Sequence, residues 1–200
     1  MSWARARERA LNRLRQHLDL GLVDEDIRGF LERLNQENPC LFTTSSCSGR
    51  LVVLEGPSLF DKRRARIAAQ THDPSRCEHL LREALQPPAR DRLRWVSLQP
   101  PILHIATATL EVAERIAREA ERAGFSRACY KRYRHGGFHV EIAASDKLHI
   151  INPTPSQIQE ACRALDAYKR KLEKLASNLL ENPPCTIETL GGHASHHAGQ

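Results

Sequence analysis

A seven-residue repeat near the C-terminal end constrains the fold of this chain more than any other feature. After Thr154-Pro155, apolar residues recur at that spacing in two interleaved series, Ile158, Leu165, Leu172 and Leu179, and Ala161, Tyr168 and Leu175. Two such series form one continuous apolar face, so the pattern predicts a single long helix that ends near residue 180. We expect this helix to pack lengthwise on the rest of the chain. A dimerising coiled coil is the alternative that the same repeat allows.

The rest of the chain alternates between helix and strand patterns. Predicted helices cover 3–18, 25–38, 73–85 and 110–123, and predicted hairpins cover 41–55 and 126–144. Single strands are predicted near 67, at 93–99, at 102–106 and at 148–151, with a corner at Pro100-Pro101. The alternation predicts an α+β fold with a mixed or antiparallel sheet and packed helices. No G-x-G-x-x-G segment follows a strand, so a Rossmann nucleotide site has no support. We expect one domain over residues 1–181 and a flexible tail over 182–200.

The predicted hairpin 41–55 carries an unusual polar segment, Thr43-Thr44-Ser45-Ser46-Cys47-Ser48-Gly49-Arg50, between apolar flanks. A plain hairpin turn needs only two to five residues with Gly, Asn or Asp. Hydroxyls, a thiol, a glycine and an arginine crowded together indicate a loop that holds a polar ligand. The alternative is a Ser/Thr-rich hairpin whose side chains bond to their own backbone.

Charge and cysteine use narrow the class of protein. The formal charge is +6, and only six of the 30 basic residues are lysines. Clustered arginines are typical of a surface that binds nucleic-acid phosphates, and a solvated face is the alternative.

Neither a membrane span nor an apolar signal segment is visible, so we expect a cytoplasmic protein. The six scattered cysteines form no C-x-x-C pair, which predicts no metal site and mostly free thiols, with a disulfide as the alternative if the source is a hyperthermophile. The tail histidines His193, His196 and His197 have no evident partners and do not change that expectation.

Several segments in succession resemble one known family. They are the polar segment above, then Thr71-His72-Asp73, Pro100-Pro101-Ile102-Leu103-His104, Val140-Glu141-Ile142 and Ser145-Asp146-Lys147. Over roughly residues 20–165 this order resembles the tRNA wybutosine-synthesizing protein 3 family. The resemblance implies an S-adenosyl-L-methionine-dependent methyltransferase that is not a Rossmann methyltransferase. Its substrate would be N4 of the 4-demethylwyosine-type base at position 37, in the anticodon loop of phenylalanine tRNA.

The resemblance also implies site residues. The implied cofactor-binding residues are Ser45, Ser46, Cys47, Ser48, Gly49, Arg50 and Glu141, and the implied catalytic residues are His104, His72 and Ser46. His104 or His72 would act as general base, although a histidine within an apolar strand is also a common core residue. Arg50 would meet the cofactor carboxylate or an RNA phosphate. Cys47 would contact the cofactor or pack as a core thiol, and Glu141 would either project into a cleft or lie on the surface.

Basic residues outside the polar segment complete the predicted site. The side chains expected to meet RNA phosphates are Lys62, Arg63, Arg64, Lys131, Arg132 and Arg134. Two other functions fit the same residues: a non-catalytic basic RNA-binding protein, and a binding protein for another anionic small molecule. A monomer is the favoured oligomeric state.

Overall fold

The computed structural model describes residues 2–61 and 63–185, and these residues form two compact units. The first unit contains residues 2–47, Ile102–Ala143 and the chain from Lys171 onward. The second unit contains Ser48–Pro101 and Ala144–Arg170. Each unit has its own four-stranded sheet, and every strand pair in both sheets is antiparallel. The predicted α+β class is therefore confirmed.

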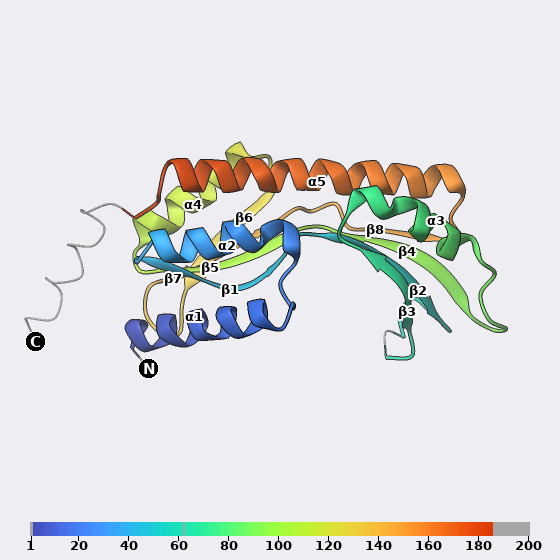
Figure 1. Cartoon of the computed structure of the whole chain (residues 1–200), viewed down its shortest axis with the longest axis horizontal. Helices are drawn as coiled ribbons and strands as arrows, with labels where there is room; N and C mark the ends of the chain where they lie inside the picture. Colours follow the sequence, from blue (N-terminus) through green and yellow to red (C-terminus); the bar gives the residue numbers. More distant parts are fainter. Residues whose placement is uncertain (1, 62, 186–200) are drawn as a thin grey trace, which may run out of the picture. The chain divides into compact units, whose positions relative to one another are not determined.

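The sheet of the first unit has the strand order β1-β5-β7-β6. These strands are β1 (Leu41–Cys47), β5 (Ile102–Thr107), β7 (Phe138–Ala143) and β6 (Arg127–Arg132). Helix α1 (Trp3–Asp19) lies on one face, and α2 (Glu25–Glu37) and α4 (Leu110–Arg122) lie on the other (Figure 1). The predicted helices 3–18 and 110–123 and the hairpin of β6 and β7 are confirmed. Thr109 caps α4 by accepting a hydrogen bond from Val112 N–H.

The two faces of this sheet differ in character, because side chains alternate along each strand. The face toward α4 carries Leu103, Ile105, Val140 and Ile142, which are all fully buried. The face toward α1 carries Phe42 and Ala106, which form a small core with Ala6 of α1. Further along the same face come His104, His139 and Glu141. One face is therefore a closed apolar core, and the other is a mixed surface that α1 only partly covers.

The second unit contains the sheet β3-β2-β4-β8. Its strands are β3 (Arg66–Thr71), β2 (Arg50–Gly56), β4 (Leu93–Gln99) and β8 (Leu148–Ile151). The predicted helix 73–85 begins as a 3-10 turn, η1 (Pro74–Arg76), and continues as α3 (Cys77–Leu85). Asp73 caps the turn by accepting a hydrogen bond from Ser75 N–H. The predicted single strands near 67, at 93–99 and at 148–151 are confirmed.

The long helix α5 (Pro155–Glu181) confirms the expectation drawn from the seven-residue repeat. All seven seam residues are buried, among them Ile158, Leu165, Leu175 and Leu179 with no exposed surface. The helix contributes its residues up to Arg170 to the second unit and the following ones to the first. Most of the predicted tail, including its histidines, lies outside the described residues.

The predicted hairpin over 41–55 is wrong. Strand β1 pairs with β5, whereas β2 pairs with β3 and β4, so the two strands lie in different sheets. Gly49, between them, has a φ of +85°. A Cβ at this position would meet Pro101 Cδ at 2.9 Å, which restricts the position to glycine. The local pattern indicated two strands and a turn, but it could not show that the partner of β1 lies far along the chain.

The expectation of mostly free thiols is also wrong. Cys40 is bonded to Cys185, and Cys77 to Cys162. The fold brings the paired Cα atoms to 5.7 and 6.2 Å, within the range that a disulfide spans. The paired cysteines are 145 and 85 residues apart in the sequence, so no local motif indicates the pairing. The other two cysteines are Cys47, which is half-buried, and Cys129, which is exposed.

Candidate functional site

Three predicted site residues form one row across the sheet of the first unit. Ser45 on β1 pairs with His104 on β5, and His104 pairs with Glu141 on β7. Ser45 Oγ lies 2.8 Å from His104 Nδ1, and His104 Nε2 lies 3.7 Å from the Glu141 carboxylate. The side chains of His104 and Glu141 remain 26% and 36% exposed. His104 therefore lines an accessible face and is not a core residue.

A β-bulge creates this row. The register between β1 and β5 shifts between Thr43 and Ser45, so Thr44 is the extra residue. Without the shift, Ser45 would point to the same face as Thr43, whose hydroxyl meets the Asn35 amide of α2. The bulge turns Ser45 toward His104, in keeping with the use of bulges to re-aim side chains near functional sites.

His104 has one nitrogen that no hydrogen bond satisfies. Nδ1 meets Ser45, but Nε2 is buried and has no hydrogen-bond partner among the described residues. If Nδ1–H donates to Ser45 Oγ, the lone pair of Nε2 is available to take a proton. The resulting imidazolium would face the carboxylate of Glu141. This geometry is suited to a general base with a nearby acid that stabilises its charged form.

A second histidine, His139, lies next to His104. Its ring lies 5.1 Å from that of His104 and stacks on Tyr133 at 5.7 Å with an angle of 22° between the planes. Its Nε2 lies 3.2 Å from Thr44 Oγ1. Burial, followed by the charges of His104 and Lys131, lowers the pKa of His139 below its ordinary value. The lowered pKa favours the neutral form of His139 beside His104.

A cavity of about 480 Å³ lies next to this row within the first unit. One wall is α1, another is the start of the polar segment with Ser45 and Ser46, and the third is the turn after β6. Three arginines line it, Arg9, Arg13 and Arg134, and we call them the cavity arginines. Its lining also includes His17 and His135 but no acidic residue. Desolvation, followed by the charges of Arg134 and Arg9, lowers the pKa of His135.

The later part of the polar segment belongs to the second unit. The ammonium group of Lys169, which is buried, donates to Ser48 Oγ at 2.7 Å, to Ser48 O at 3.0 Å and to Gly49 O at 3.2 Å. Arg50 donates to Gln99 Oε1 at 2.8 Å and to Gln70 Oε1 at 2.9 Å. Both acceptors are neutral, so the guanidinium keeps an uncompensated positive charge. His72 follows β3 in the same unit and is half-buried.

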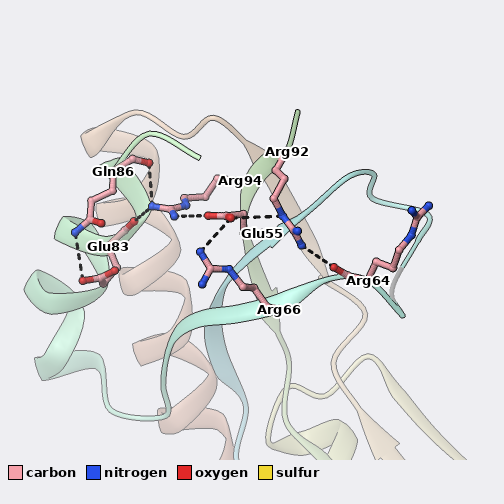
Figure 2. A network of polar contacts seen from close by, with 7 residues as sticks. All are labelled: Glu55, Arg64, Arg66, Glu83, Gln86, Arg92 and Arg94. Atoms are coloured by element: carbon pink, nitrogen blue, oxygen red, sulfur yellow. Dashed lines mark hydrogen bonds and ion pairs between the residues drawn. The ribbon is translucent and has the colours of Figure 1, made fainter. Parts of the chain in front are cut away.

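A different arrangement of arginines surrounds Glu55 in the second unit (Figure 2). Glu55 is fully buried and meets Arg94, Arg66 at 3.1 Å and Arg92 at 3.5 Å. We call these four residues the Glu55 cluster. Arg94 also donates to the carbonyl oxygens of Glu83 and Gln86 at the end of α3. The hydrogen bond from Arg94 is the largest cause that lowers the pKa of Glu55.

The predicted RNA-binding residues are distributed over both units. Arg63 and Arg64 lie in the β2–β3 loop of the second unit, where Arg64 is paired with Asp61 at 2.6 Å. Lys62 lies outside the described residues. In the first unit, Lys131 is on the face of His139, whereas Arg132 is on the opposite face, over the ring of Phe138. Arg134 lines the cavity.

Sequence reasoning missed several residues around the row and the cavity. His139 precedes Glu141 by two positions, so strand alternation could have placed both on one face. Arg9, Arg13 and His17 share a helical face at a spacing of four residues, which was a readable signal. Lys169 carried no local signal, because its partners, Ser48 and Gly49, lie far away along the chain.

Comparison with known proteins gives the class and then the family. Residues 5–190 match the family described as Methyltransferase TYW3. A relative from Pyrococcus abyssi is 32% identical over 176 residues, covering 88% of this chain and 87% of its own. A second, from Pyrococcus furiosus, is 31% identical and covers 89% and 95%. Both are named tRNA(Phe) 7-((3-amino-3-carboxypropyl)-4-demethylwyosine(37)-N(4))-methyltransferase 1.

Solved structures agree with this match. The PH1069 protein from Pyrococcus horikoshii is 28% identical, with a TM-score of 0.79, and covers 89% of this chain and 96% of its own. The chain belongs to the Methyltransferase TYW3 family. Among the described residues, no helix is long and apolar enough to cross a membrane.

Proposed function

We propose that this chain transfers a methyl group to N4 of a 4-demethylwyosine-type base at position 37 of phenylalanine tRNA. The observation that carries the proposal is the match to relatives that bear this name over nearly nine tenths of the chain. The proposed methyl donor is S-adenosyl-L-methionine, and the base would be presented from the anticodon loop. We further propose that the protein works as a cytoplasmic monomer.

The residues present fit such a donor. Arg50 has a guanidinium bonded only to neutral glutamine oxygens, so it can still bind a carboxylate such as that of the donor. When bound, the donor supplies an electrophilic methyl group. Cys47, Ser48 and Gly49 adjoin Arg50 and stay predicted cofactor contacts, as do Ser45, Ser46 and Glu141.

The row Ser45–His104–Glu141 supplies the proton chemistry in this proposal. The ring nitrogen of the base must lose its proton as it is methylated, and His104 is the proposed acceptor of that proton. Ser45 Oγ forms a hydrogen bond with Nδ1 of His104, and this bond fixes the orientation of the imidazole ring. Glu141 then stabilises the imidazolium. The protein needs no nucleophile of its own, because the methyl group passes directly between the two bound molecules, which must be held in line. His72 stays the alternative base.

The proposal is tested with tRNA that carries the tricyclic precursor base. The protein, its disulfides intact, is incubated with this tRNA and S-adenosyl-L-methionine, and the digested nucleosides are weighed by mass spectrometry. The expected result is a gain of one methyl group on the precursor nucleoside. Binding of the tRNA without methylation and without cofactor binding would instead identify a non-catalytic RNA-binding protein.

His104→Gln tests the assignment of the base. We expect the single-turnover rate to fall by about 10²–10⁴-fold, the usual contribution of general-base catalysis, with an unchanged melting temperature. His79→Gln is the matched control, because His79 is an exposed residue of α3, in the second unit, and is not a member of the row. A rate that stays normal in His104→Gln would move the base role to His72.

A further inference from the structure

The cavity arginines have no acidic partner among the described residues. Many exposed arginines pair with an acid three or four positions away on their own helix, as Arg33 does with Glu37 and Arg122 with Glu119. Arg9, Arg13 and Arg134 form no ion pair or side-chain hydrogen bond with any residue that the structure describes. Three uncompensated charges around one cavity attract an anion.

The arrangement of the charges points to an extended anion. Arg9, Arg13 and His17 follow one another at intervals of four residues, so they form a row along one face of α1. Eight residues of helix span about 12 Å. A single carboxylate or phosphate ion would meet one or two of these side chains, whereas consecutive phosphates of a nucleic-acid strand could meet the whole row.

The walls of the cavity fit a nucleotide chain as well. Its volume of about 480 Å³ is in the range of pockets that enclose a small organic molecule. Thr44, Ser45 and Ser46, which all carry hydroxyls, line it beside the cavity arginines. Hydroxyl and guanidinium groups are the usual protein partners of phosphate and sugar oxygens. Ser45 also belongs to the row with His104, so a strand bound here would adjoin the proposed base.

We infer that this cavity binds the sugar-phosphate backbone of a single-stranded RNA through Arg9, Arg13 and Arg134. The inference rests on the proposed function for the identity of the RNA, the anticodon loop of the substrate tRNA. It assigns the main RNA contact of the first unit to α1 and the turn after β6. Arg132 lies on the other face of the sheet and is not part of this contact.

Binding of a short, unmodified single-stranded RNA tests the inference without any methyl transfer. Affinity is measured by fluorescence anisotropy at several salt concentrations. We expect Arg13→Gln to weaken binding about tenfold and to reduce the salt slope by about 0.7. The combined replacement of Arg9, Arg13 and Arg134 should reduce the slope by about 2, three times the single-contact value.

Arg15→Gln is the matched control. Arg15 is an exposed arginine of α1 that lines a different hollow, together with Arg7 and Pro39. Loss of this charge should leave affinity and salt slope nearly unchanged. Equal effects of Arg13→Gln and Arg15→Gln would overturn the inference, because they would indicate a general attraction to a basic helix.

The base named for both relatives carries a 3-amino-3-carboxypropyl side chain. The carboxylate of this side chain is a competing occupant of the cavity. If Arg13→Gln weakened binding only of RNA that carries the aminocarboxypropyl base, the cavity would recognise that carboxylate and the inference would be overturned. The methylation assay separates the two proposals. Arginine-dependent binding of unmodified RNA without methyl transfer would support this inference and contradict the proposed function. Methyl transfer by a protein whose RNA affinity is unchanged when all three arginines are replaced would support the proposed function and contradict this inference.

Discussion

The cavity arginines and the Glu55 cluster use the same side chain for opposite purposes. In the Glu55 cluster, three arginines surround a fully buried carboxylate, and Arg94 is buried with it (Figure 2). Around the cavity, three exposed arginines have no acid among the lining residues. Buried charge must be neutralised within the protein, whereas exposed charge is solvated by water and stays available to bind a ligand. The counter-charge, rather than the number of arginines, therefore separates a structural cluster from a binding surface.

The largest expected effect comes from removing the counter-charge of the structural cluster. Glu55→Gln keeps the shape of the side chain but leaves the buried Arg94 and its neighbours without an anion. We expect the free energy of unfolding to fall by about 3–5 kcal/mol, as when one partner of a buried ion pair is removed. Urea denaturation under non-reducing conditions measures the change.

Glu37→Gln is the control for that experiment. Glu37 pairs with Arg33 at 2.9 Å on the surface of α2, where both side chains are largely exposed. Such pairs contribute only about 0.3–0.5 kcal/mol. Similar losses in the two variants would mean that the Glu55 cluster is no more structural than a surface pair.

The contribution of Glu55 should also depend on pH in a definite direction. Its pKa in the folded protein lies below the ordinary value, chiefly because of the hydrogen bond from Arg94. The stabilisation is therefore complete above the unfolded pKa of about 4.3 and is lost as the pH falls through the folded pKa. The stability difference between wild type and Glu55→Gln should shrink as the pH is lowered from about 7 to about 3. A constant difference across this range would contradict the assignment.

A new acid at the cavity should convert the binding surface into a paired cluster. In His17→Glu, the new carboxylate lies four residues beyond Arg13 on the same helical face. We expect RNA affinity to fall several-fold, while the free energy of unfolding changes by less than about 0.5 kcal/mol. His17→Gln removes the imidazole without adding charge, so it should keep most of the affinity. Equal affinities of the two variants would show that the cavity charge is not what holds the RNA.

The smallest effect is expected from Arg13→Gln on stability. Like charges four positions apart on a helix repel by about 0.2–0.5 kcal/mol, so loss of the Arg9–Arg13 repulsion should raise the free energy of unfolding slightly. Thermal unfolding in low salt is the suitable measurement. A clear decrease in stability would indicate that Arg13 has a structural role and would weaken the contrast with the Glu55 cluster.

Much of the fold could be predicted from local patterns. Strand alternation gave residues 93–99 with the observed bounds, and Thr109 with Gly124 marked both ends of α4. The hairpin over 41–55 failed because strand pairing depends on which apolar faces meet, a non-local property. Cysteine pairing failed for a similar reason, since connectivity cannot be deduced from sequence alone.

The candidate site was predictable only in part. Ser45, His104 and Glu141 came from a family resemblance, and the structure places them in one row. Their order in the row depends on strand register and on the bulge at Thr44, neither of which the sequence reveals. The assignment of cofactor and catalytic roles stays a prediction. Lys169 was hidden in a helix whose pattern indicated only packing.

The bond between Cys40 and Cys185 makes most of this protein a covalent ring. The ring encloses all eight strands of the described residues, whereas α1 and α2 lie outside it on the N-terminal side. A protease that cuts one peptide bond anywhere inside the ring leaves both pieces joined in a single molecule. The same closure limits how far the two ends can separate in the denatured state, a constraint worth about 4–5 kcal/mol for loops of this order. A nicked chain could thus retain its native partners and refold, until a reductant opens the ring.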